Sequence, residues 1–162
     1  MNQFKTLALL SMLSALLISI SYYTLGGTGG VIIGILIAAA TNLGSWFYSD
    51  KIALAAHKAQ PVSRETAPEL YTMVETLAKK ADIPVPGVYI LPTESANAFA
   101  TGRDPQHAAV AVTQGIMKML STDELEGVIA HELSHIMNRD TLTQAVAATI
   151  AGAIAFLAQI LQ

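Results

Sequence analysis

The sequence predicts a membrane-anchored α+β protein with a helical hairpin, a small helix-and-sheet domain and the start of a third apolar helix. Three observations lead to this fold class. The charged residues are almost all confined to one segment, that segment alternates between helical and strand patterns, and one of its helices carries two histidines one turn apart. The three parts are expected at residues 1–49, 50–140 and 141–162.

The distribution of charge defines the apolar parts. Of the 21 charged residues, 20 lie between residues 50 and 140, which leaves 44 uncharged residues before this segment and 22 after it. A bilayer core needs about 20 apolar residues in a helix. The first stretch therefore predicts transmembrane helices at 6–25 and 31–48, separated by the glycine-rich residues 26–30, and the last predicts a third helix from residue 141.

Two other interpretations of the first apolar stretch are less satisfactory. A cleaved signal peptide would explain Lys5 before an apolar run, but this run is too long and is followed by a second one. Helices of a soluble core would need a polar face, and 44 uncharged residues provide none. Lys5, Lys51, Lys58 and Arg64 flank the hairpin, so the positive-inside rule places both of its ends, and the charged segment, in the cytoplasm.

Small residues in the apolar stretches raise two further expectations. Gly26, Gly30 and Gly34 form a row at helical spacing, which indicates either close helix packing or a flexible loop. The third stretch ends at Gln162 with no polar flank, and its small residues suit packing against another helix. The chain is therefore expected to be the N-terminal part of a longer protein.

Composition excludes several classes of protein. The absence of cysteine excludes a disulfide framework, a zinc ribbon, an iron–sulfur site and a thiol nucleophile. A net charge of −3 lacks the basic footprint of a nucleic-acid-binding protein. Only 13% of the residues are charged, against about 25% in ordinary soluble domains, which argues against disorder and against a cytosolic globule.

The charged segment reads as helix, small sheet, helix. Thr66 with Glu69, and Ser121 with Glu124, have the spacing of capping boxes and predict two helix starts. The first helix is stopped by the prolines near residue 84, and the second continues to about Asn138. Three apolar runs between them predict strands at 88–91, 97–101 and 108–113, with a turn at 102–105.

The last helix contains the motif that carries chemistry, His131-Glu132-Leu133-Ser134-His135. Residues four apart lie on one face of a helix, so His131 and His135 can reach one metal ion. Glu132 is turned away by about 100° and can contact a water bound to that metal. This spacing predicts a zinc site in which the metal activates water and Glu132 acts as general base.

A zinc site of this kind needs a third protein ligand. The metzincin pattern would require Gly and His where the chain has Asn138 and Thr141, so that class is excluded. Asp140 is expected to orient a ligand histidine, or to interact near the helix end. No spacing supports any of the other candidates as the third ligand: His57, His107 and Glu94. The third ligand is expected beyond residue 162.

Three blocks of sequence and the two N-terminal spans resemble the HtpX family of membrane-embedded zinc metalloproteases, which is related to the CAAX prenyl protease superfamily. The blocks are NAFATG at 97–102, AVTQG at 111–115 and DELEGVIAHELSHIMNRD at 123–140. The resemblance implies a zincin-like domain with one Zn²⁺ per subunit. In it, His131 and His135 are ligands, Glu132 is the catalytic base, and a glutamate on a later helix is the third ligand.

The segment Asn97, Ala98, Phe99 and Ala100 resembles the substrate-binding edge strand of such enzymes. An edge strand can hold an extended peptide through main-chain hydrogen bonds that any sequence makes. The alternative is an ordinary strand with Phe99 in the core.

The family resemblance also implies a function. It predicts a multi-pass endopeptidase of the bacterial inner membrane that cuts misfolded or damaged membrane proteins on the cytoplasmic side. Its partners would be protein or peptide substrates and the lipid bilayer, and not nucleic acid. Two alternatives stay open: a membrane-anchored scaffold or binding module, and a chain that is inactive for lack of the third ligand. A purely structural zinc site usually includes cysteine, which is absent.

Overall fold

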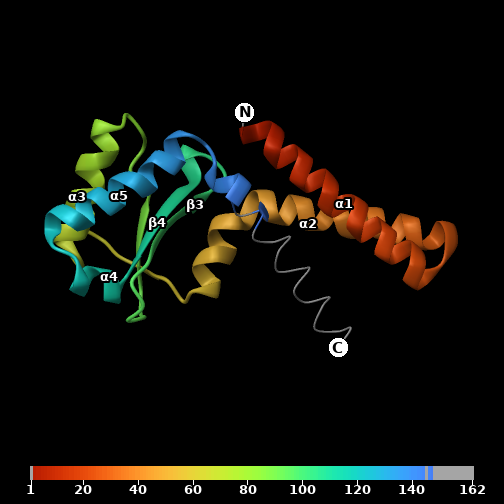
Figure 1. The fold of residues 1–162 in the computed structure, drawn as a ribbon, viewed down its shortest axis with the longest axis horizontal. Coiled ribbons are helices and arrows are strands. Elements are labelled where there is room, and N and C mark those ends of the chain that lie inside the picture. The colour runs from red at the N-terminus through yellow and green to blue at the C-terminus, as the bar shows by residue number, and fades with distance from the viewer. Residues whose placement is uncertain (1, 145, 148–162) are drawn as a thin grey trace. The chain divides into compact units, whose positions relative to one another are not determined.

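The computed structural model describes residues 2–144, 146 and 147 (Figure 1). It contains two compact units, one formed by Met1–Ser49 with Leu142–Gln162 and the other by Asp50–Thr141. We refer to them as the apolar unit and the polar unit.

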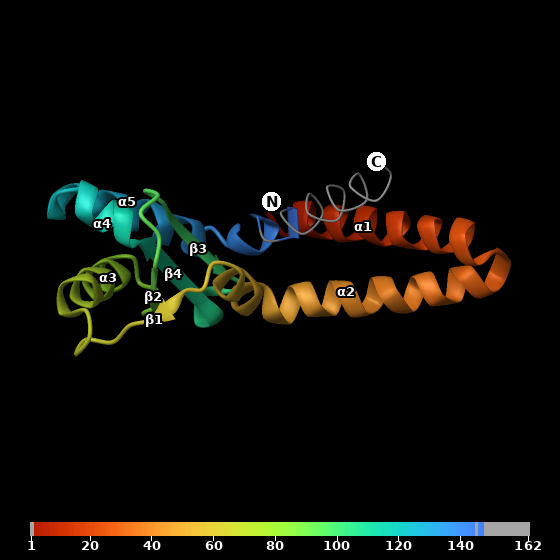
Figure 2. The same cartoon turned by 90° about the horizontal axis from the view of Figure 1, so that it is seen from below.

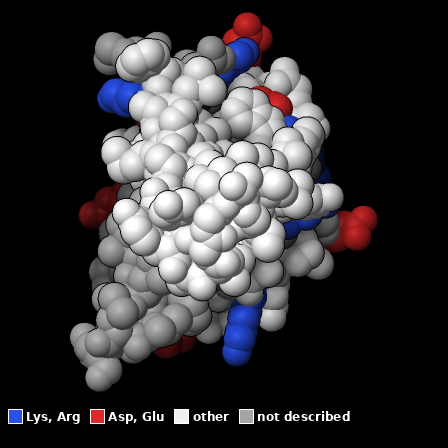
Figure 3. All heavy atoms as spheres, turned by 90° about the vertical axis from the view of Figure 1, so that its right-hand side faces the viewer, with Lys and Arg blue, Asp and Glu red and all other residues white. Residues whose placement is uncertain are grey.

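The apolar unit is built on two long helices, α1 (Asn2–Leu25) and α2 (Gly27–Ala56). Both are long and apolar enough to cross a membrane, judged by length and composition. Figure 3 looks onto the end where α1 turns into α2, and the near surface there is formed by uncharged residues. The predicted break at residues 26–30 is too wide, because only Gly26 lies outside the helices and α2 begins at Gly27 with both residues at positive φ.

Helices α1 and α2 approach each other closely at two glycines. A Cβ added to Gly30 would lie 2.5 Å from the carbonyl oxygen of Ser21, and one added to Gly34 would lie 2.8 Å from the Cα of Ile18. Close packing is therefore the correct interpretation for Gly30 and Gly34, whereas Gly26 has open space around it and forms the turn.

The predicted third helix belongs to the apolar unit from Leu142 onward, whereas Thr141 belongs to the polar unit. Residues 141–144, 146 and 147 are helical, and the rest of that prediction lies outside the described residues. Thr143 shares a hydrogen bond of 2.7 Å with Thr6, and Leu142 and Val146 pack with Leu13 of α1.

The polar unit contains a four-stranded sheet in the order β1-β2-β4-β3. Its strands are β1 (Gln60–Pro61), β2 (Gly87–Leu91), β3 (Ala98–Gly102) and β4 (Ala108–Thr113). Strands β2 and β4 are parallel, and the other two pairs are antiparallel. The three predicted strands are confirmed to within one residue at each end. β1 was not predicted, since two residues show no periodicity.

Helices cover both faces of this sheet. Helices α3 (Pro68–Lys80) and α5 (Thr122–Met137) lie on one face (Figure 2). Val74, Ile129 and Leu133 of these helices are fully buried in the same cluster as residues of the strands. The last turns of α2 cover the other face through Leu54, which packs against Leu91, Ala109 and Ala111. The short helix α4 (Gln114–Met119), which was not predicted, follows β4 directly.

The two predicted capping boxes have different outcomes. The Ser121 amide donates to the Glu124 carboxylate at 2.8 Å, which confirms the predicted start of α5. The prediction for Thr66 is wrong: α3 begins at Pro68, and the Thr66 hydroxyl accepts from the amide of Ser63 at 2.8 Å instead. The hydroxyl is used by the turn that precedes the helix, and Pro68 needs no capping partner because it has no N–H.

Candidate active site

Helix α5 presents His131 and His135 side by side. Their ring centroids are 4.9 Å apart, with an angle of 83° between the planes. The rotation of the helix is fixed by Ile129, Leu133 and Ile136, which are buried against the sheet. Because these apolar residues occupy the inner face, His131 is exposed and the side chain of His135 remains 25% exposed.

Glu132 contacts the edge of the sheet. Its Oε2 accepts a hydrogen bond of 3.0 Å from the backbone N–H of Ala100, the central residue of β3. These two residues are 32 positions apart in the chain. The fold thus brings the predicted general base and the predicted substrate strand into direct contact.

The pairing of β3 explains why the amide of Ala100 is available. The Thr113 amide of β4 donates to the Asn97 carbonyl at 3.0 Å, so the main chain at Asn97 is directed toward β4. Main-chain groups of an antiparallel strand alternate between its two sides. Those of Ala98, Ala100 and Gly102 are therefore directed away from β4, toward the side of β3 that no strand covers among the described residues.

The side chains of the four predicted substrate-binding residues face different parts of the polar unit. The side chains of Ala98 and Ala100 face α5, whereas Phe99 faces the cluster around Leu54, with its ring centroid 5.3 Å from that of His57. The Phe99 side chain packs against a core cluster, and the substrate-binding role of the strand stays a prediction. Asn97 is exposed, and its amide donates to Thr113 Oγ1 at 3.0 Å.

Asp140 reaches back to His135. Its carboxylate oxygens lie 3.1 and 3.2 Å from His135 Nδ1. The turn that brings it there is a Schellman motif, in which the amide of Asp140 donates to the carbonyl of His135 and the amide of Arg139 donates to that of Ile136. Arg139 occupies the left-handed position with φ 53°, where glycine is usual.

Thr141, the residue that follows this turn, also contacts β3, in addition to the contact made by Glu132. Thr141 Oγ1 donates to the carbonyl oxygen of Gly102 at 2.7 Å, across 39 positions of sequence. Thr141 is 3% exposed. Threonine after Asp140 carries no local signal for this role, and Gly102 falls in the predicted turn after the strand, so no pattern in the sequence pointed to this contact.

The other candidate ligands lie in separate contacts. His107 Nδ1 is 2.7 Å from Asp104, and Glu94 accepts from Lys118 at 2.6 Å. Burial would raise the pKa of Asp104, but the hydrogen bond and charge of His107 outweigh it and hold that pKa below its usual range. Both pairs are explained by these local interactions.

The donor set on α5 fits two of the ligands of a zinc ion. Two imidazoles lie together, and Asp140 contacts Nδ1 of His135 as a carboxylate partner of a ligand histidine does. In the described part of the chain, no third histidine, aspartate or glutamate joins them to complete a group of three. A catalytic zinc site has three protein ligands, so these residues fit a part of such a site.

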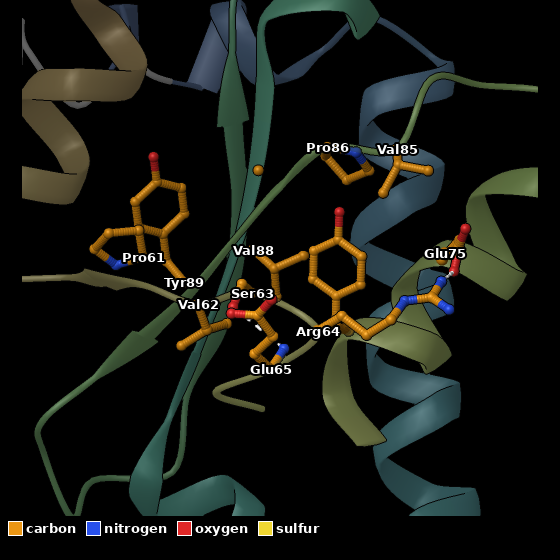
Figure 4. Close-up of a pocket in the computed structure, with 12 residues that line it drawn as sticks. Pro61, Val62, Ser63, Arg64, Glu65, Glu75, Val85, Pro86, Val88 and Tyr89 are labelled. Atoms are coloured by element: carbon orange, nitrogen blue, oxygen red, sulfur yellow. Dashed lines mark hydrogen bonds and ion pairs between the residues drawn. The ribbon is translucent and has the colours of Figure 1, made fainter. Parts of the chain in front are cut away.

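The polar unit also has a cavity of about 610 Å³ that involves none of these residues. It is lined by residues 61–65 and 85–89, together with Tyr71 and Glu75 of α3. Figure 4 shows Arg64 reaching across this cavity to form an ion pair with Glu75.

Comparison with known proteins agrees with the motif. Residues 64–162 match the profile of peptidase family M48. Proteins named "Protease HtpX homolog" match nearly the whole chain: 70% identity over 98% of the chain in Trichormus variabilis, 52% over 97% in Sulfurihydrogenibium sp. and 48% over 100% in Pelotomaculum thermopropionicum. The chain spans about half the length of these relatives, between 53% and 57%.

Proposed function

Because the chain belongs to peptidase family M48, we propose that the full-length protein is a membrane-bound, zinc-dependent endopeptidase. The observation that carries the proposal is the hydrogen bond from Ala100 of β3 to Glu132 of α5. It joins a helix with a metal-binding pattern to a strand edge that can hold a peptide.

His131 and His135 would hold the zinc ion, together with a third ligand contributed from outside residues 1–162. When bound, zinc polarises the scissile carbonyl and lowers the pKa of a coordinated water. Asp140 accepts from His135 Nδ1, which fixes the orientation of that ring.

Glu132 would carry the proton in this reaction. Its Oε2 is held by Ala100, so Oε1 is the oxygen that takes a proton from the attacking water and later gives it to the leaving amine. The bond from Ala100 keeps the carboxylate in one orientation before the reaction begins.

Strand β3 would hold the substrate. An extended peptide added beside β3 can bond to the outward main-chain groups of Ala98 and to the outward carbonyl of Ala100. Such contacts use no side chain of the substrate and suit an enzyme that acts on many sequences.

The remaining features concern where the enzyme acts. Helices α1 and α2 would anchor it in the bacterial inner membrane, and their basic flanks would place the polar unit in the cytoplasm. A peptidase held at this surface is suited to cutting misfolded or damaged membrane proteins in their cytoplasmic parts.

The proposal is tested by Glu132→Gln in the full-length protein, with cleavage of denatured casein and zinc content measured together. The variant is expected to bind one zinc per chain and to lose cleavage by at least about 10²-fold, because the base is gone while the ligands remain. His131→Ala is the matched control and should lose zinc as well. Undiminished proteolysis by the Gln variant would contradict the mechanism.

A further inference from the structure

We infer that Thr141 is a positioning residue that holds strand β3 against the end of helix α5 and so keeps Ala100 aligned with Glu132. This inference rests on the proposed peptidase function. It assigns a role to a residue outside the histidine motif and outside the strand.

Strand β3 is held by side chains at three points. Thr113 Oγ1 bonds to both main-chain groups of Asn97 at the start of the strand, on the side of β4. Glu132 and Thr141 bond to Ala100 and Gly102. Since residues two apart in a strand point the same way, these last two bonds both lie on the outer side of β3. Glu132 and Thr141 therefore occupy the outer edge at Ala100 and Gly102, and among the described residues no strand covers this edge at Ala98.

The bond from Thr141 lies at the C-terminal end of β3. Gly102 is the last residue of β3 and has φ +127°, a conformation reached easily only by glycine. Its carbonyl and Thr141 are both buried. Without the threonine hydroxyl the carbonyl would be left buried without this donor, and the end of the strand would shift to satisfy it.

The turn after α5 connects this bond to the histidine motif. The Schellman motif at residues 135–140 brings the Asp140 carboxylate into contact with the His135 ring. The next residue, Thr141, donates its hydrogen bond to Gly102. A hydrophobic contact usually accompanies this motif between the positions held here by His135 and Asp140. In this chain the polar contact between Asp140 and His135 replaces it. The turn therefore orients the proposed ligand His135 and, through Thr141, holds the end of β3.

The experiment compares Thr141→Val and Thr141→Ser in the full-length, zinc-loaded protein. Valine keeps the volume of the side chain but removes the donor, and serine restores it. For the valine variant we expect kcat per bound zinc to fall about 10- to 100-fold with KM changed less than about 3-fold, because the base is displaced relative to the strand. The serine variant should recover to within about 3-fold of the wild-type kcat.

Val74→Ala serves as the stability control, since Val74 is fully buried on α3 and is none of the residues assigned to the site. It should lower the unfolding temperature without changing kcat per bound zinc. A second measurement needs no activity: amide hydrogen exchange in peptides covering 98–102 should accelerate in Thr141→Val, while exchange in α3 is unchanged.

The inference is overturned if Thr141→Val keeps the wild-type kcat, if Thr141→Ser fails to restore it, or if Val74→Ala loses kcat to the same degree. If the wild-type protein cleaves nothing, the proposed function fails, and hydrogen exchange alone decides the role of Thr141. Unchanged exchange at 98–102 in the valine variant would then refute it.

Discussion

The replacement of glycine by alanine is expected to have opposite effects at two positions of the polar unit. At Gly102 an added Cβ would lie 2.2 Å from the carbonyl oxygen of His107 and 2.7 Å from the Cα of Ala108, where ordinary contacts are 3.4–4 Å. The φ of +127° adds backbone strain of about 1–3 kcal/mol. Moving the crowded turn costs about 1–3 kcal/mol more. Gly102→Ala should therefore destabilise the polar unit by at least about 2 kcal/mol.

Gly127 is the matched control. It lies within α5 with nothing within 4 Å of an added Cβ, so alanine there should stabilise the helix by about 0.5–1 kcal/mol. For a domain of this size 1 kcal/mol corresponds to about 4–8 °C, and the two variants should differ in unfolding temperature by more than about 10 °C. Scanning calorimetry of the full-length protein in detergent measures this. If Gly102→Ala unfolds within about 2 °C of the wild type, the close approach at the end of β3 does not constrain the chain as reasoned.

Two further predictions concern the ends of α5. Arg139→Gly should raise the unfolding temperature by about 4–8 °C, because glycine adopts the left-handed φ without strain, whereas Arg139→Val should lower it; calorimetry that ranks valine above glycine would contradict this. Hydrogen bonds from the Ser121 side chain and amide lower the pKa of Glu124, so its contribution to stability is complete above the ordinary pKa of 4.5 and is lost as the pH falls through the lowered value. The difference in unfolding temperature between wild type and Glu124→Ala should therefore shrink below pH 4.5, and a difference that grows with acidity would refute the assignment.

Much of the secondary structure follows from local patterns. The charge-free stretches predicted α1 and most of α2, but not the extension of α2 beyond residue 48 to Ala56, which includes charged residues. The Ser121–Glu124 spacing predicted the start of α5. The prediction for Thr66 was wrong because a nearer amide, that of Ser63, competes for its hydroxyl. Strand β1 was missed because its two residues are paired only through β2.

Local sequence is enough to bring His131, Glu132 and His135 together, because they lie within one predicted helix and residues three and four apart are adjacent in any α-helix. Tertiary packing decided which main-chain groups those side chains meet. The contacts Ala100–Glu132 and Gly102–Thr141 join residues 32 and 39 positions apart. They depend on the small side chains of β3, which let α5 lie against that strand, and on the side of the strand to which each amide and carbonyl is directed. Neither the packing nor the direction of a main-chain group is encoded in a local pattern of residue types, and only the folded chain shows them.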